Sequence, residues 1–158
     1  MGAPPQPPQP PEPSQPPRAA EPVSLRPARL EFQISGSPFA PAYRLSWRAG
    51  KLLYEAVVAD PGPDEGAERT WELFVPSAAQ WQAFWDAVDG IGVWDWAPES
   101  VAEHGDGTTW RLELHRGPRG VTCSGHGAYP GPGEGTASPA FRDFLAALGL
   151  LVEGRRLR

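Results

Sequence analysis

The chain has 158 residues, a length that suits one domain, and a formal net charge of −5 at pH 7. An acidic domain repels phosphate backbones, which argues against nucleic acid as the main partner. A single cysteine excludes an internal disulfide, and no apolar run approaches the roughly 18 residues of a membrane helix. We therefore expect a cytoplasmic protein that binds neither nucleic acid nor membrane.

Residues 1–27 hold 11 of the 21 prolines and almost no large apolar side chain. Such a segment buries too little surface to offset its ordering entropy, so we predict a disordered leader with polyproline II character. Residues 28–152 are predicted to form one domain, and residues 153–158 a short basic tail.

Alternation of apolar and polar residues after the leader predicts strands at 30–35, 43–47, 52–58 and 70–75, and further strands at 108–116 and 121–124. In this interpretation five tryptophans face the core: Trp47, Trp71, Trp81, Trp85 and Trp110. The outward positions of the strands at 43–47 and 108–116 carry arginine, serine, glutamate and histidine.

Two amphipathic helices complete the fold. Ser77 precedes the first, with Gln80 three residues later as a capping box, and Gly90 is expected to end it. Ser138 caps the second, with a proline at its first position, and Gly149 is expected to end it. The sequence thus predicts an α+β fold in which an antiparallel sheet of about six strands is packed by both helices on one face. The strand-and-helix patterns of the two halves echo each other, which leaves an internal duplication open.

Cys123 and His126 are the residues that most suggest catalysis, because a cysteine nucleophile needs a nearby base. Alternation places Cys123 on the core face with Val121, where burial raises a thiol pKa. We therefore interpret Cys123 as structural and predict no catalytic residue.

Acidic residues cluster between the first helix and the strand at 108–116: Asp86, Asp89, Asp95, Glu99, Glu103 and Asp106. Their spacing differs from that of a calcium-binding loop, and the histidines and cysteine lack zinc-ligand spacing. We interpret the cluster as a solvated surface and predict neither a metal nor a cofactor.

Trp94 and Trp96 are not assigned to the core by these patterns. Two residues apart, they would face the same side of an extended segment. Because tryptophan is enriched where proteins recognise partners, we predict a binding surface that includes Trp94, Trp96, Tyr129 and His126.

Residues 106–148 carry a longer pattern, Asp106-Gly107-x-x-Trp110-x-Leu112, followed by Gly125-x-x-Ala128-Tyr129-Pro130 and a Phe-x-x-Phe helix. This pattern resembles a family of small uncharacterised bacterial α+β domains that read DG-x-x-W-x-L, G-x-N-A-Y-P and F-x-x-F. The resemblance implies an α+β fold and no particular activity. Gly127 stands where that pattern places asparagine.

Three functions stay open at this point. The first is a non-catalytic module that binds a protein, a peptide or a small ligand. The second is a small hydrolase that uses Cys123 with His126 or the acidic cluster. The third is a scaffold tethered through the proline-rich leader. The sequence leaves open the oligomeric state and which sheet face is uncovered.

Overall fold

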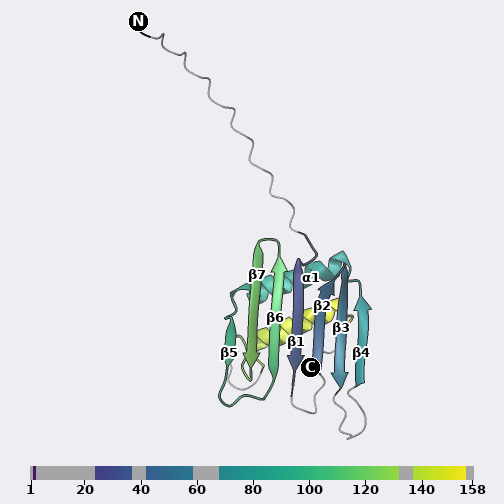
Figure 1. Cartoon of the computed structure of the whole chain (residues 1–158), viewed down its shortest axis with the longest axis vertical. Helices are drawn as coiled ribbons and strands as arrows, with labels where there is room; N and C mark the ends of the chain where they lie inside the picture. Colours follow the sequence, from purple (N-terminus) through teal and green to yellow (C-terminus); the bar gives the residue numbers. More distant parts are fainter. Residues whose placement is uncertain (1, 3–23, 37–41, 59–67, 132–136, 156–158) are drawn as a thin grey trace.

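A computed structural model describes residues 24–36, 42–58, 68–131 and 137–155, together with Gly2 (Figure 1). Of the predicted disordered leader (1–27), only Gly2 and residues 24–27 are described, and the rest lies outside the described residues. Of the predicted basic tail (153–158), only residues 153–155 are described. The described strands are β1 (Arg29–Ser35), β2 (Ala42–Arg48), β3 (Lys51–Val58), β4 (Glu68–Phe74), β5 (Glu99–Val101), β6 (Thr109–Arg116) and β7 (Arg119–His126). The helices are α1 (Ala78–Ile91), the short 3₁₀ helix η1 (Val93–Asp95) and α2 (Pro139–Leu151).

The described strands form one sheet in the order β4-β3-β2-β1-β6-β7-β5. The predicted α+β class and the two long helices are confirmed, but the sheet has seven strands and is mixed rather than purely antiparallel. The strand missed by the sequence is β5, which pairs in parallel with β7. Three residues are too few to show alternation, so this strand depends on the free edge of β7 rather than on a local pattern.

The start of α1 is as the sequence predicts. Ser77 Oγ accepts a hydrogen bond from the Gln80 backbone, and the Gln80 side chain accepts one from the Ser77 backbone at 2.8 Å. The predicted end at Gly90 is wrong, because the helix continues to Ile91. Gly92 ends it instead, with φ of 77°, a left-handed conformation that glycine adopts without steric cost.

Helix α2 also passes its predicted end. Ser138 caps it as expected, but the helix continues through Gly149 to Leu151. A helical glycine costs only about 1 kcal/mol relative to alanine. Complete burial of Leu151 and Val152 offsets that cost, since a fully buried leucine or valine contributes about 1.5–3 kcal/mol.

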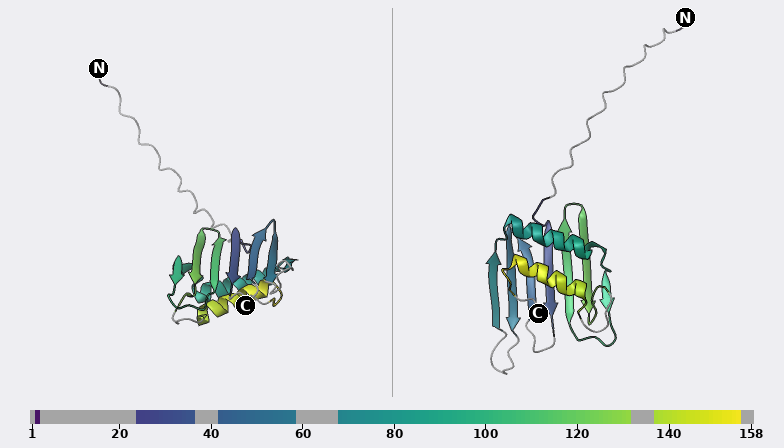
Figure 2. Two further views of the ribbon diagram at one scale, coloured as in Figure 1. Left: turned by 60° about the horizontal axis from the view of Figure 1, so that its bottom comes forward. Right: turned by 180° about the vertical axis from the view of Figure 1, so that it is seen from behind.

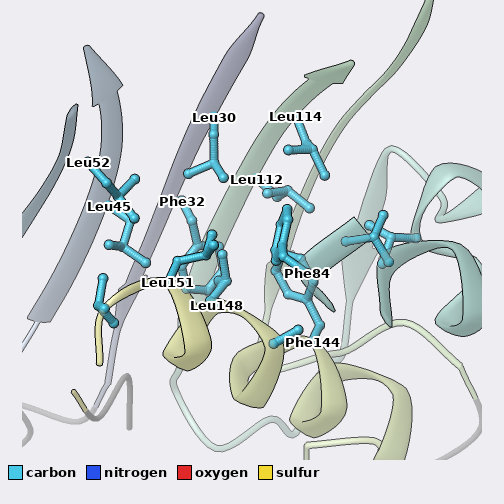
Figure 3. Close-up of a cluster of buried hydrophobic side chains, with 14 of the residues drawn as sticks. Leu30, Phe32, Leu45, Leu52, Phe84, Leu112, Leu114, Phe144, Leu148 and Leu151 are labelled. Atoms are coloured by element: carbon cyan, nitrogen blue, oxygen red, sulfur yellow. The ribbon is translucent and has the colours of Figure 1, made fainter. Parts of the chain in front are cut away.

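Both helices lie side by side across one face of the sheet (Figure 2). Their apolar faces meet the inward residues of β1, β2 and β6, as Figure 3 shows for Phe84 and Phe144 against Phe32 and Leu112. The Gln80 side chain donates to the Leu150 carbonyl at 2.8 Å and so joins the two helices. No described helix covers the opposite face, and none is long and apolar enough to cross a membrane.

The predicted inward orientation of Trp71 is wrong. In β4, Phe74 lies opposite the buried Leu52, so alternation turns Trp71 to the uncovered face, where it is 69% exposed. This strand carries apolar residues on both of its faces, Trp71 and Leu73 on one and Phe74 on the other, and its register with β3 decides which face is buried. The similar segment of the second half is Thr109-Trp110-x-Leu112, which matches Thr70-Trp71-x-Leu73, but its Trp110 is 1% exposed. The two tryptophans that match in the sequence therefore lie on opposite faces of the sheet.

Because the two tryptophans face opposite sides of the sheet, replacing each by alanine should lower the free energy of unfolding by different amounts. Trp110→Ala should lower the free energy of unfolding by about 3–5 kcal/mol, because it opens a cavity in the core. Trp71→Ala should change it by no more than about 0.5 kcal/mol. Chemical denaturation of both variants measures the difference, and equal losses would contradict the assignment of the two faces.

Candidate functional site

Residues of the pattern at 106–130 meet in space where β6 begins and β7 ends. The Tyr129 hydroxyl donates to the Asp106 carboxylate at 2.5 Å, and Asp106 also accepts from the Thr108 backbone at 2.9 Å. The Trp110 indole nitrogen donates to the Ala128 carbonyl at 2.9 Å. These contacts attach the segment after β7 to the segment before β6.

Two glycines allow this close attachment. A side chain at Gly125 would overlap the Trp110 indole and the Ala128 carbonyl. Gly127 has φ of 60°, and its backbone lies directly against Gly105. Asparagine tolerates the left-handed conformation, but its Cβ would overlap Gly105. The departure from the asparagine of the resembled pattern therefore has a steric reason in this chain.

Tyr129 is held by its partners rather than left free for a ligand. Burial and the hydrogen bond to Asp106 raise the pKa of its hydroxyl to about 12. Burial alone would raise the pKa of Asp106, but hydrogen bonds from Tyr129 and Thr108 outweigh it and lower that pKa. The Tyr129 ring packs on Phe141, with ring centroids 4.9 Å apart.

Trp94 lies in η1 rather than in an extended segment, so it does not share a side with Trp96. It is half-buried and stacks on Trp85 with ring centroids 6.1 Å apart. Its indole nitrogen donates to Asp89 at 2.7 Å, and the Arg119 guanidinium lies over its ring. The polar end of Trp94 is thus already bonded within the domain.

Trp96 contacts a different cluster. It packs edge-on against Phe144 at 5.3 Å and against Trp110 at 6.1 Å, and it also contacts Phe141. The structure therefore brings Trp96 and Tyr129 together around Phe141 and separates both from the cluster of Trp94.

Cys123 and His126 lie on opposite faces of β7. Cys123 is 1% exposed on the helix-covered face, and burial raises its thiol pKa to about 11. His126 is exposed, and its Nδ1 lies 3.0 Å from the Thr109 hydroxyl. The structure thus does not bring the thiol and the imidazole together as a nucleophile and its base.

The acidic residues are spread over several elements. Asp89 pairs with Arg119 at 3.4 Å, Asp86 accepts from Gln82, and Asp106 accepts from Tyr129. Among the described residues, no three histidine, cysteine or acidic side chains gather into a group that could hold a metal ion.

The uncovered face carries an apolar strip near the β4 edge of the sheet. We define this strip as Trp71 and Leu73 of β4 with Leu53 and Val57 of β3. Leu73 is 49% exposed and lies opposite Leu53, which is half-buried. The strip places a large tryptophan ring in water on a face that no described helix covers.

Next to the strip, β2, β1 and β6 form an arginine belt, which we define as Arg29, Arg44, Arg48 and Arg111 with Glu31 and Glu113. Glu31 and Glu113 lie directly opposite each other, a destabilising arrangement for like charges. Arg29 lies 2.9 Å from Glu113 and 3.7 Å from Glu31, so its charge offsets part of this repulsion. Arg48 lies 3.5 Å from Glu31 on the other side.

A shallow depression of about 300 Å³ lies in this belt, lined by Arg29, Glu31, Phe32, Gln33, Arg44, Arg111 and Glu113. Alternation had already turned the arginines of β2 and β6 outward. Sequence reasoning missed the depression because it did not place β1 between these two strands.

The Tyr129–Asp106 bond predicts a pH-dependent loss in Tyr129→Phe. This variant should lose about 1–2 kcal/mol of unfolding free energy, because a hydrogen bond to a charged group disappears. The folded-state pKa of Asp106 lies below its usual 3.8, so the stabilisation is present above that value and is lost as the pH falls through the lowered pKa.

Urea denaturation across pH measures this loss, which should be largest near neutrality and shrink below about pH 4. Tyr43→Phe is the matched control, because the Tyr43 hydroxyl donates to no carboxylate among the described residues. Equal losses in the two variants at pH 7 would contradict a specific role for the bond.

The burial of Cys123 predicts an inert thiol. A maleimide probe at pH 7 should label native Cys123 at least about a hundredfold more slowly than the chain in denaturant, because the folded thiol is neutral and covered. Mass spectrometry follows the labelling. Native labelling as fast as that of the denatured chain would revive the cysteine-hydrolase hypothesis.

Comparison with known proteins adds no assignment. No protein-family model matches the chain, and no curated protein is similar to it at a significant level. The resemblance to small bacterial domains therefore stays an expectation drawn from the residues at 106–148.

Proposed function

We propose that the domain is a non-catalytic module that binds a protein or peptide, and that the uncovered face of its sheet recognises the partner. The observation that carries this proposal is Trp71, which is 69% exposed in the middle of the edge strand β4. Burial of apolar surface stabilises a complex by about 25 cal/mol per Å², and a tryptophan offers a large area. Tryptophan and arginine are also the residues most enriched among interface hot spots.

The setting of Trp71 supports the same function. Leu73 is exposed beside it, and the arginine belt occupies the next strands of the same face. Trp94, Trp96 and Tyr129 offer less to a partner, because their rings pack on core aromatics. We therefore assign recognition to the uncovered face rather than to those residues. A cytoplasmic location stays part of this proposal.

The hydrolase hypothesis receives less support from the same contacts. It requires a reactive thiolate or a converging set of carboxylates. Cys123 is buried beneath the helices, and Asp89 and Asp106 are bonded to separate partners. A binding function needs no such group and uses the side chains that are exposed.

Affinity purification with the full chain as bait tests the proposal. In a lysate of the organism that produces the chain, Trp71→Ser should reduce recovery of specific partners by about thirtyfold or more, as expected for a hot-spot residue. Leu73→Ser should reduce it less. Quantitative mass spectrometry measures the recovery.

Leu150→Ser is the matched control, because Leu150 is 49% exposed like Leu73 but lies on α2. Its partner recovery should equal that of the unmodified chain. Full recovery of the same partners by both β4 variants would refute the assignment of the uncovered face.

A further inference from the structure

One row of side chains crosses five neighbouring strands on the uncovered face. Cross-strand pairing places Trp71 of β4 beside Glu55 of β3, Glu55 beside Arg44 of β2, Arg44 beside Gln33 of β1, and Gln33 beside Arg111 of β6. The row joins the apolar strip to the depression in the arginine belt. A ligand that lies across the strands would therefore meet both.

The belt end of this row has the donors that recognise a carboxylate. Gln33 lies between Arg44 and Arg111, each one strand away, which is about 4.8 Å along the hydrogen-bonding direction. All three side chains are exposed and line the depression. Guanidinium groups bind carboxylates through paired N–H donors, and the Gln33 amide adds a further donor.

Arg111 is the arginine most available for such binding. Glu31 and Glu113, the acidic residues of the depression, are already paired with Arg29. Arg44 forms a longer ion pair with Glu31, at 3.9 Å. Within the described part of the chain, no carboxylate forms an ion pair with Arg111. Among the described residues, its donors are therefore not engaged by a carboxylate and can bind one supplied from outside.

We propose that Arg44, Gln33 and Arg111 bind an acidic side chain of an extended peptide whose apolar side chain packs on Trp71. This inference rests on the proposed function and specifies its ligand. Four arginines against Glu31 and Glu113 give the belt a positive formal charge on a chain of net −5, and this charge stays positive when Glu55 of the row is added. A positive surface complements an acidic peptide.

The spacing of the row specifies the peptide further. Trp71 and Gln33 are three strands apart, which is about 14 Å. Four residues of extended chain span about the same length, and side chains at i and i+4 lie on the same side. The preferred ligand therefore has an apolar residue and an aspartate or glutamate four positions apart.

Selection of displayed random linear peptides on the full chain tests this specification. The enriched sequences should carry the apolar residue and the acid at that spacing. A fluorescent peptide of the enriched sequence is then measured by anisotropy. Replacing its acidic residue by the amide should weaken binding about tenfold, as should Arg111→Gln in the protein. Combining the amide peptide with the Arg111→Gln variant should weaken binding little more than either change alone, because both remove the same contact.

Arg142→Gln is the matched control, because it removes the same charge from an exposed position on α2. It should leave the affinity unchanged. Peptides that need Trp71 but bind the Arg111→Gln and Arg142→Gln variants equally would overturn the carboxylate site and leave the proposed function standing. Enriched peptides that bind Trp71→Ser as tightly as the unmodified chain, or no enrichment at all, would overturn both. Single-stranded oligonucleotides bound through Arg111 in place of acidic peptides would also overturn the inference.

Discussion

Burial of two aromatic helix faces against one side of the sheet is the interaction on which this structure depends. Trp81, Phe84 and Trp85 of α1 and Phe141 and Phe144 of α2 are all at most 2% exposed. Side chains of this size supply much of the apolar area that stabilises a small domain. Because both helices use the same face of the sheet, the opposite face is left without a helical cover.

The uncovered face is charged where the core is apolar. Its central strands carry long charged side chains, which hold their polar ends in water while their stems lie over the sheet. Arg29 contacts two facing glutamates and reduces a repulsion that would otherwise weaken the pairing of β1 with β6. Trp71 departs from this pattern, and for that reason it carries the proposed function.

The residues with the most distinctive sequence pattern have a structural role. Two hydrogen bonds, from Tyr129 to Asp106 and from Trp110 to the Ala128 carbonyl, attach the segment after β7 to the start of β6. Gly125 is required where the chain passes against the indole of Trp110. A distinctive motif in this chain therefore marks a tightly packed junction, whereas the proposed recognition surface has no motif.

Local patterns were sufficient for the elements whose physics is local. The capping box of Ser77 and Gln80, the alternation of β1, and the apolar stripes of both helices depend on neighbours within a few residues, and the structure confirms them. The buried position of Cys123 also follows from alternation alone.

Only the tertiary structure decided the properties that depend on pairing between distant segments. Register with β3, rather than the composition of β4, turned Trp71 outward, since both faces of that strand carry apolar residues. The strand order placed Gln33 of β1 between Arg44 and Arg111, residues that are 67 positions apart in the chain. Periodicity reports which side of its own strand a residue occupies, but not which strand lies beside it, and the candidate site is made of those neighbours.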